Sequence, residues 1–93
     1  MYEIIFNKQF KSAHKRIVRS GRFKHDELEK IMEILSRGEA LPTRYHDHAL
    51  KGNFFGQREC HIGGDTLLVY EIDTQNKIVT FFDIGNHAQV FGS

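Results

Sequence analysis

The fold is built around the stretch 66-TLLVYEIDTQNKIVTFFDI-84. It contains two runs rich in β-branched and aromatic residues, 66–73 and 77–84, joined at the polar segment 74–77. This pattern predicts a β-hairpin with a four-residue loop. Both runs are apolar on both faces, which is typical of strands in the middle of a sheet. We therefore expect the rest of the sheet to extend outward from this hairpin.

A third strand is predicted at 57–62, directly before the hairpin. Because side chains alternate along a strand, Cys60 and Ile62 share one face, and Glu59 and His61 point to the other. The Gly-Gly-Asp sequence that follows is a turn signal. At the other end of the chain, residues 2–6 alternate large apolar side chains and predict a short strand.

Two helices are predicted between the first strand and Pro42. Asn7 is placed to cap the first helix, and Asp26 with Glu29 resembles a capping box at the start of the second. Gly38 is placed to end the second helix. Apolar residues recur at helical spacing in both segments, at Phe10, Ala13, His14, Ile17 and Val18, and at Leu28, Ile31, Met32 and Leu35.

The order of elements predicts an α+β fold. Residues 43–56 are expected to form a long loop, and 87–91 a short terminal segment of no predicted type. An N-terminal strand, a two-helix hairpin and three later strands place the helices on one face of a mostly antiparallel sheet. With 93 residues the chain has room for one core, so we expect a single domain over 1–93.

Composition narrows the class of protein. One cysteine excludes an intrachain disulfide framework and an all-cysteine zinc site. No run approaches the roughly 18 apolar residues of a membrane helix, and no stretch resembles a signal peptide. We expect a soluble cytoplasmic protein that has no contact with a membrane.

The net charge of +1 conceals a basic segment beside an acidic one. Seven bases and no acid lie in residues 8–24, whereas 26–39 carry five acids and two bases. The basic side chains lie mostly off the apolar stripe of the first helix. This asymmetry favours a polyanionic or acidic partner, although a solvated helix face is the simpler interpretation. The seven bases are Lys8, Lys11, Lys15, Arg16, Arg19, Arg22 and Lys24.

Histidines are the candidate chemical groups. Four of the six histidines follow the helices, at His46, His48, His61 and His87, and imidazole is suited to proton transfer near neutral pH. His61 and Asp65 flank a tight turn, where their side chains could approach each other. No nucleophile elbow or phosphate-binding glycine loop is present, and Cys60 is predicted to face the core.

Two interpretations of the histidines remain open. Each could be an exposed or hydrogen-bonded structural residue. Alternatively, the His46-x-His48 pair with His61 or Asp65 could supply three ligands to zinc, although no second metal-binding motif supports this.

Acid–base groups beside a basic helix suit RNA cleavage. The 2′-hydroxyl of RNA can attack the neighbouring phosphate, so the protein needs a base, an acid and positive charge but no nucleophile of its own. An aromatic side chain such as Phe91 can stack on a splayed base, or can equally anchor the terminal segment in the core.

Four segments together resemble the RelE/ParE superfamily of type II toxins, and its YafQ-like branch most closely. They are Asp47-His48-Ala49-Leu50-Lys51-Gly52, Cys60-His61-Ile62-Gly63-Gly64-Asp65, Leu68-Val69-Tyr70 and Gly85-Asn86-His87-Ala88-Gln89-Val90-Phe91. The resemblance implies a RelE-like fold and a ribosome-dependent endoribonuclease that cleaves translated mRNA in the A site without a metal or other cofactor. It also implies a cognate antitoxin that silences the toxin, and contact with operator DNA only through that antitoxin.

The resemblance also implies roles for individual residues. His48, His61, Asp65 and His87 would share the acid–base and phosphate-stabilising work, and Phe91 would position the substrate. The basic helix would dock on ribosomal RNA, or on the acidic region of the antitoxin, through Lys8, Lys11, Lys15, Arg16 and Arg19.

Two alternatives belong to other functional classes. A ParE-like toxin would bind DNA gyrase without cutting RNA, although such relatives usually lack the histidine cluster. A regulatory module would use the histidines as metal ligands.

Overall fold

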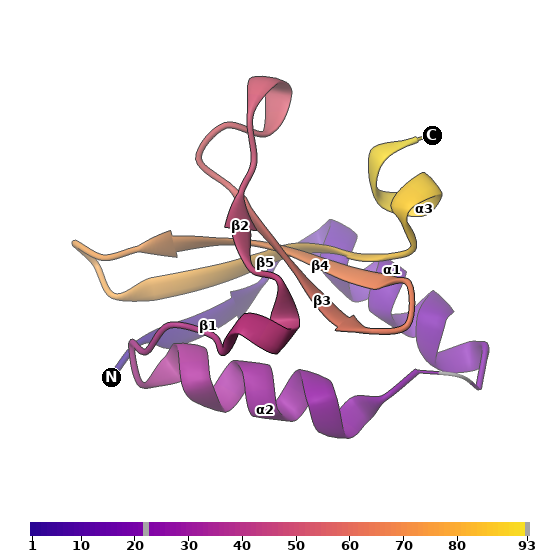
Figure 1. Ribbon diagram of the computed structural model, residues 1–93, viewed down its shortest axis with the longest axis horizontal. Helices are drawn as coiled ribbons and strands as arrows, with labels where there is room; N and C mark the ends of the chain where they lie inside the picture. The colour runs from indigo at the N-terminus through magenta and orange to yellow at the C-terminus, as the bar shows by residue number, and fades with distance from the viewer. Residues whose placement is uncertain (22, 93) are drawn as a thin grey trace.

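The computed structural model describes residues 1–21 and 23–92, and Figure 1 shows the arrangement of their elements. Arg22, part of the basic segment, lies outside the described residues. The strands are β1 (Glu3–Phe6), β2 (His48–Ala49), β3 (Arg58–Gly63), β4 (Thr66–Asp73) and β5 (Ile78–Gly85). The α-helices are α1 (Lys8–Arg19), α2 (His25–Ser36) and α3 (His87–Phe91), and the 3₁₀ turns are η1 (Thr43–Tyr45) and η2 (Gly52–Phe54).

The β4–β5 hairpin is the centre of a five-stranded sheet with the order β1-β5-β4-β3-β2. The prediction of a central hairpin is therefore confirmed. β1 pairs with β5 in parallel, and the other three pairs are antiparallel. Val79, Phe81 and Leu68 are fully buried because helices cover one face of these strands and further segments cover the other.

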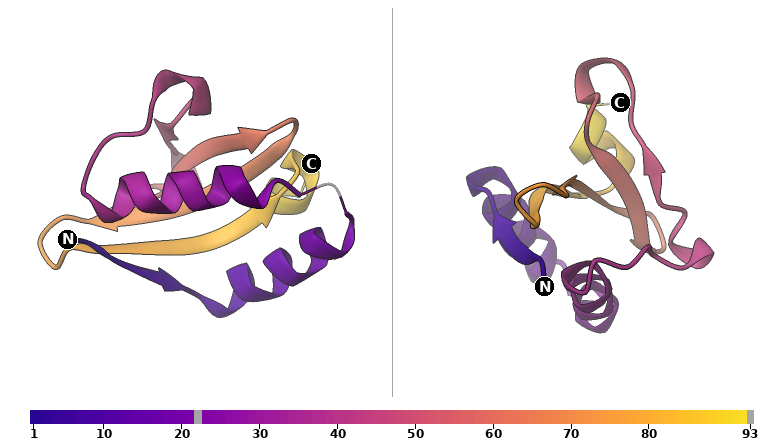
Figure 2. Two further views of the ribbon diagram at one scale, coloured as in Figure 1. Left: turned by 90° about the horizontal axis from the view of Figure 1, so that it is seen from below. Right: turned by 90° about the vertical axis from the view of Figure 1, so that its left-hand side faces the viewer.

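Helices α1 and α2 lie on the same face of the sheet, as Figure 2 shows. Their apolar stripes bury Phe10 and Ala13 from α1 and Ile31 from α2 against the sheet. Asn7 caps α1 as predicted, because its side chain accepts a hydrogen bond of 2.8 Å from the backbone N–H of Phe10. The prediction of an α+β fold with two helices on a mostly antiparallel sheet is confirmed.

The predicted start of the second helix is wrong. The helix begins at His25, and its cap position, Lys24, makes no side-chain capping hydrogen bond. Asp26 lies inside the first turn, where its negative charge favours the positive end of the helix dipole. The end was predicted correctly: Gly38 takes a positive φ of 75° directly after the last turn.

The segment predicted as a long loop adds an edge strand to the sheet. β2 has two residues and pairs antiparallel with β3, so that His48 lies opposite Glu59. A strand this short leaves no periodic signal in the sequence, and only its pairing with β3 defines it.

The other face of the sheet carries the segment around η2 and the C-terminal helix. In Figure 1 both rise on the side of the sheet opposite α1 and α2. Helix α3 is held by a capping box, in which Asn86 and Gln89 exchange side-chain and backbone hydrogen bonds of 2.8 Å. None of the helices in the described ranges is long and apolar enough to span a bilayer.

Candidate active site

The centre of the site is the carboxylate of Glu59 on β3. Glu59 is only 6% exposed, yet its side chain lies between two imidazoles. Its Oε1 atom is 3.6 Å from Nε2 of His48 and 3.5 Å from Nε2 of His61. Because Glu59 and His61 share one face of β3 and His48 pairs with Glu59 across β2, the strand register brings the three together. A carboxylate at this position orients both rings.

His48 is held in one orientation by a second contact. Its Nδ1 atom lies 2.8 Å from the carbonyl oxygen of His46. A carbonyl oxygen only accepts hydrogen bonds, so Nδ1 carries the proton and Nε2 is the atom presented to Glu59. His48 remains exposed on its outer side, where a substrate can reach it.

A polar anchor fixes the segment that carries His48. Asp47 accepts a 2.9 Å hydrogen bond from Nη2 of Arg58 and another from the hydroxyl of Tyr70 on β4. The hydrogen bond to Asp47 raises the pKa of Arg58, and burial, followed by the same carboxylate, raises the pKa of Tyr70. Asp47 thus connects β2 to the centre of the sheet and restricts the movement of the His46–His48 segment.

His87 and Phe91 form a second group on α3. Their ring centroids lie 5.0 Å apart, and Phe91 meets Phe54 of η2 edge-to-face at 5.1 Å. The partly buried ring of Phe91 therefore joins the C-terminal helix to the β2–β3 connection. A cavity of about 180 Å³ between these two segments is lined by Phe54, Val69 and Val90.

The strand register places the two groups near each other. His61 on β3 pairs with Leu67 on β4, and Leu67 pairs with Gly85 on β5, two residues before His87. Two strand spacings amount to about 10 Å between the backbones of His61 and Gly85. His48 and His61 belong to the edge of the sheet formed by β2 and β3, and His87 belongs to α3, which follows β5.

Asp65 lies in a different environment from His61. It lines a cavity of about 270 Å³ with Arg16 and Ser20 of the α1 end and with Asn86 and Gln89 of the α3 end. His61 instead faces Glu59 and packs against His46, at 5.3 Å between ring centroids. The structure therefore groups Asp65 with the N-terminal end of the helix that carries His87.

The five basic residues predicted to bind RNA are exposed along α1. They are Lys8, Lys11, Lys15, Arg16 and Arg19. Phe10 and Ala13 lie on the opposite side of the helix and are buried in the core, so the basic side chains face solvent. Arg16 also lines the cavity that contains Asp65, which connects the basic face to the edge of the candidate site.

Cys60 faces the core as predicted. It is completely buried, and burial raises the pKa of its thiol, so it is unsuited to act as a nucleophile. Across residues 1–21 and 23–92 no three His, Cys, Asp or Glu side chains are grouped so as to hold a metal ion. The proposed ligand set of His46, His48 and a third residue is not assembled in this arrangement.

Sequence reasoning missed Glu59 as a functional residue. It placed Glu59 on the same face of the strand as His61 but gave it no role. The signal in the sequence was an acidic residue inside a predicted strand, directly before a cysteine that is buried. A carboxylate that becomes buried at such a position needs a polar partner. The partner His48 came from a segment that was expected to be a loop.

Comparisons with protein families and with individual proteins point to the same family of bacterial toxins. A family model described as the bacterial toxin of type II toxin–antitoxin system, YafQ, matches residues 2–92. The mRNA interferase toxin YafQ of Escherichia coli (strain B / BL21-DE3) is 32% identical over 88 residues, which are 94% of this chain and 88% of that protein.

Solved structures share the fold along nearly the whole chain. A metal-bound toxin from Helicobacter pylori is 35% identical with a TM-score of 0.88, covering 98% of this chain and all of that one. YafQ in the E. coli DinJ–YafQ complex is 28% identical with a TM-score of 0.83, covering 99% of this chain and all of that one.

Proposed function

The chain belongs to the YafQ family of bacterial type II toxins, and from that premise we propose that it is an mRNA interferase. It is the toxin component of a toxin–antitoxin pair and an endoribonuclease that cuts mRNA during translation in the cytoplasm. The observation that supports this most directly is the pair of imidazoles held by Glu59, on a strand two sheet positions away from the strand that leads into His87.

The reaction needs two proton transfers. One group removes the proton of the 2′-hydroxyl, whose oxygen attacks the adjacent phosphorus and displaces the 5′-oxygen of the next nucleotide. A second group protonates that leaving oxygen, so the products carry a 2′,3′-cyclic phosphate and a 5′-hydroxyl. Each transfer contributes roughly 10²–10⁴-fold to the rate.

The two groups of side chains suit these tasks because they come from separate elements, β2–β3 and α3, about two strand spacings apart. We assign one transfer to His87 and the other to the imidazoles of His48 and His61, whose protonated forms also stabilise the phosphorane-like transition state. Glu59 is a positioning residue that orients the two rings. Asp65, which lines a cavity with Asn86 and Gln89 at the start of α3, shares the acid–base work, as the family resemblance implies. Phe91 stacks on a base of the bound RNA.

The basic face of α1 is proposed to dock on ribosomal RNA near the A site. Five exposed bases on one helix provide the salt-dependent attraction that phosphate contacts require. A cognate antitoxin with an acidic segment would compete for the same surface and silence the toxin. Operator DNA would be contacted only through that antitoxin.

The family assignment favours this function over the two alternatives. The histidine group is present, whereas gyrase-binding relatives usually lack it. A metal-dependent module would need a ligand set, which the residues described here do not assemble.

Transcript mapping in a reconstituted translation reaction tests the proposal. The wild-type chain should cut a translated mRNA, and His87→Gln should abolish cutting without changing thermal unfolding, because His87 is exposed. His25→Gln is the matched control, since His25 is also an exposed histidine at the start of a helix. Intact transcripts on stalled ribosomes with folded wild-type protein would refute the nuclease.

A modified substrate separates the acid from the base. A bridging sulfur in place of the 5′-oxygen is a leaving group that departs without protonation. The variant that lacks the general acid should cut this substrate at nearly the wild-type rate, whereas the variant that lacks the base should not. Equal defects of His87→Gln, His48→Gln and His61→Gln on both substrates would refute the division of labour.

A further inference from the structure

A polar cavity lies beside the candidate active site at the edge of β3. It measures about 340 Å³ and is formed where η1, the start of α2 and the β3–β4 turn meet. Its charged lining consists of Lys24, Glu27 and Arg44, and His46 and His61 complete its polar wall. Neither Lys24 nor Arg44 nor His46 has a role in the proposed chemistry.

Arg44 is held in a fixed orientation at this cavity. Its guanidinium donates a 2.7 Å hydrogen bond to the hydroxyl of Tyr45 and lies 4.5 Å from the centre of the same ring. The Tyr45 hydroxyl in turn donates a 2.8 Å hydrogen bond to Glu27. Because Tyr45 is buried, this chain of contacts orders a side chain that is itself exposed, so little further ordering is needed to bind an anion.

The cavity is continuous with the active site through two histidines. His61 lines the cavity and also contacts Glu59, and the ring of His46 lies 5.3 Å from the ring of His61. His46 has a φ of 51°, in the left-handed region that residues other than glycine rarely adopt. This conformation supplies the backbone turn that places His46 at the cavity and lets its carbonyl hold His48.

The charge of the lining favours an anion. Lys24 and Arg44 bring two positive charges and Glu27 one negative charge. Glu27 accepts a hydrogen bond from Tyr45 and lies 3.9 Å from Nη1 of Arg44 and 3.7 Å from Nζ of Lys30, so the lining keeps a net positive charge. The guanidinium of arginine is planar and carries five N–H donors, and their geometry allows two parallel hydrogen bonds to the oxygens of one phosphate.

We propose that this cavity binds a backbone phosphate of the RNA next to the cleaved linkage, with Arg44 as its principal contact. The proposal rests on the proposed function, because it assumes that RNA crosses the site past His61. It makes Arg44 a substrate-positioning residue that fixes the register of the RNA on the acid–base groups.

Single-phosphate neutralisation tests the proposal. The probe is a single-stranded RNA with a 2′-O-methyl group at the cleavage position, made in versions that carry one methylphosphonate at each phosphate in turn. Neutralising one phosphate beside the cleavage position should weaken binding to the wild type about tenfold, the usual value of one charge-assisted hydrogen bond. Arg44→Gln should bind the unmodified RNA about tenfold more weakly and be insensitive to that same neutralisation.

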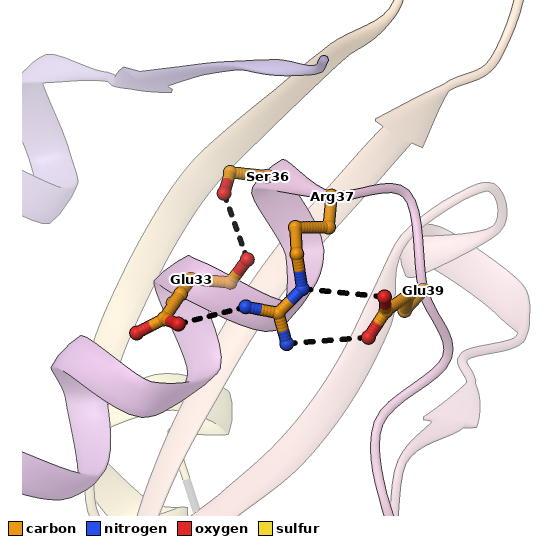
Figure 3. Close-up of polar contacts among 4 residues, drawn as sticks. All are labelled: Glu33, Ser36, Arg37 and Glu39. Atoms are coloured by element: carbon orange, nitrogen blue, oxygen red, sulfur yellow. Dashed lines mark hydrogen bonds and ion pairs between the residues drawn. The ribbon is translucent and has the colours of Figure 1, made fainter.

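Arg37→Gln is the matched control, because it removes one arginine charge at a site remote from the cavity. Arg37 is paired with Glu33 and Glu39 at the far end of α2, at 2.7 and 3.2 Å (Figure 3), away from the cavity. It should bind every version of the RNA as the wild type does. Arg44→Lys should recover part of the affinity, and thermal unfolding of each variant shows that the fold is retained.

The outcomes separate this proposal from the nuclease activity. A wild type that cuts mRNA, with Arg44→Gln responding to every neutralisation as the wild type does, overturns the phosphate site alone. An Arg44-dependent phosphate in a chain that never cuts translated mRNA overturns the nuclease and leaves the site standing. Equal weakening at all phosphates, or no measurable RNA binding by the wild type, also overturns the site.

Discussion

Glu59 determines how two of the candidate catalytic groups are presented. It is buried, and its negative charge has His48 and His61 as neighbours on the same oxygen. Burying a carboxylate is unfavourable unless it has polar partners. The imidazoles of His48 and His61 are those partners, and the contact orients both rings.

We expect Glu59→Gln to lower mRNA cleavage by roughly 10²-fold while leaving thermal unfolding nearly unchanged. Glutamine keeps the shape of the side chain but removes the negative charge that orients the two imidazole rings. The measurement is the cleavage rate as a function of pH. Glu71→Gln, an exposed glutamate on β4, is the control and should cut normally. A wild-type rate and pH profile for Glu59→Gln would show that this carboxylate has no positioning role.

His14 is a half-buried imidazole outside the active site, and its Nε2 atom is shielded from solvent. Its Nε2 atom has no hydrogen-bond partner, and its ring stacks on Phe10 and meets Phe23 and His25 edge-on. Desolvation by burial, and then the neighbouring His25, lower the pKa of His14 below its usual value of 6.5. The folded protein therefore binds the His14 proton less tightly than the unfolded chain does.

We expect His14 to make the protein sensitive to mild acid. Above pH 6.5 both states hold a neutral ring and no stability is lost; as the pH falls through that value the unfolded chain gains a proton first, so unfolding becomes easier. His14→Phe preserves the aromatic packing and should reduce the fall in Tm between pH 7.5 and pH 5. His87→Gln serves as the comparison and should keep the wild-type acid response. Identical pH dependence of Tm in wild type and His14→Phe would contradict this explanation.

At the level of elements, α1 and α3 have similar caps but different tasks. Asn7 caps a twelve-residue helix that buries Phe10 and Ala13, whereas Asn86 caps a five-residue helix with no fully buried residue. A Cβ atom at Gly85 would lie 2.7 Å from Oε1 and 3.1 Å from Cβ of Gln89, so a larger residue there would push Gln89 out of its capping position. The short helix contributes little to the core and mainly places His87.

The same substitution should therefore have opposite consequences at the two caps. Asn7→Ala should cost about 1 kcal/mol of stability with little change in cleavage. Asn86→Ala should lower Tm only slightly, yet slow cleavage about 10–100-fold because a small displacement of a catalytic group is costly. Urea unfolding and transcript cleavage measure the two effects. Parallel losses of stability and activity in both variants would argue against a positioning role for α3.

On the scale of the whole molecule, charge and chemistry are separated. The five bases are exposed on α1, whereas His48, His61 and His87 lie on β2, β3 and α3. Arg16 and Asp65 line the same cavity between the end of α1 and the start of α3. Attraction to a polyanion can thus be changed without altering the acid–base groups.

We expect Lys11, Lys15 and Arg19, changed together to Gln, to weaken ribosome co-sedimentation and to reduce its salt dependence by about two to three units of the log–log slope. The matched control changes Lys30, Arg37 and Lys77 to Gln, which removes the same charges from other surfaces. Its co-sedimentation should follow the wild type. Equal behaviour of the two triple variants would show that net charge, rather than the α1 face, governs ribosome binding.

Local patterns in the sequence were sufficient for much of the fold. The two β-rich runs in 66–84, separated by a polar turn, predicted the central hairpin, and the helical spacing of apolar residues predicted the helices. Asn7 predicted the start of the first helix, and Gly38 predicted the end of the second. Helix and strand periodicity are properties of neighbouring residues, so a single chain displays them directly. The spaced motifs likewise predicted the toxin family.

Only the tertiary structure decided which segments distant in sequence come into contact. The parallel pairing of β1 with β5, the two-residue strand β2, the pairing of Glu59 with His48 and the support of Arg44 by Tyr45 and Glu27 all join segments distant in sequence. Such contacts depend on how whole elements pack and on which buried polar groups then need partners, and no periodicity within one segment records them.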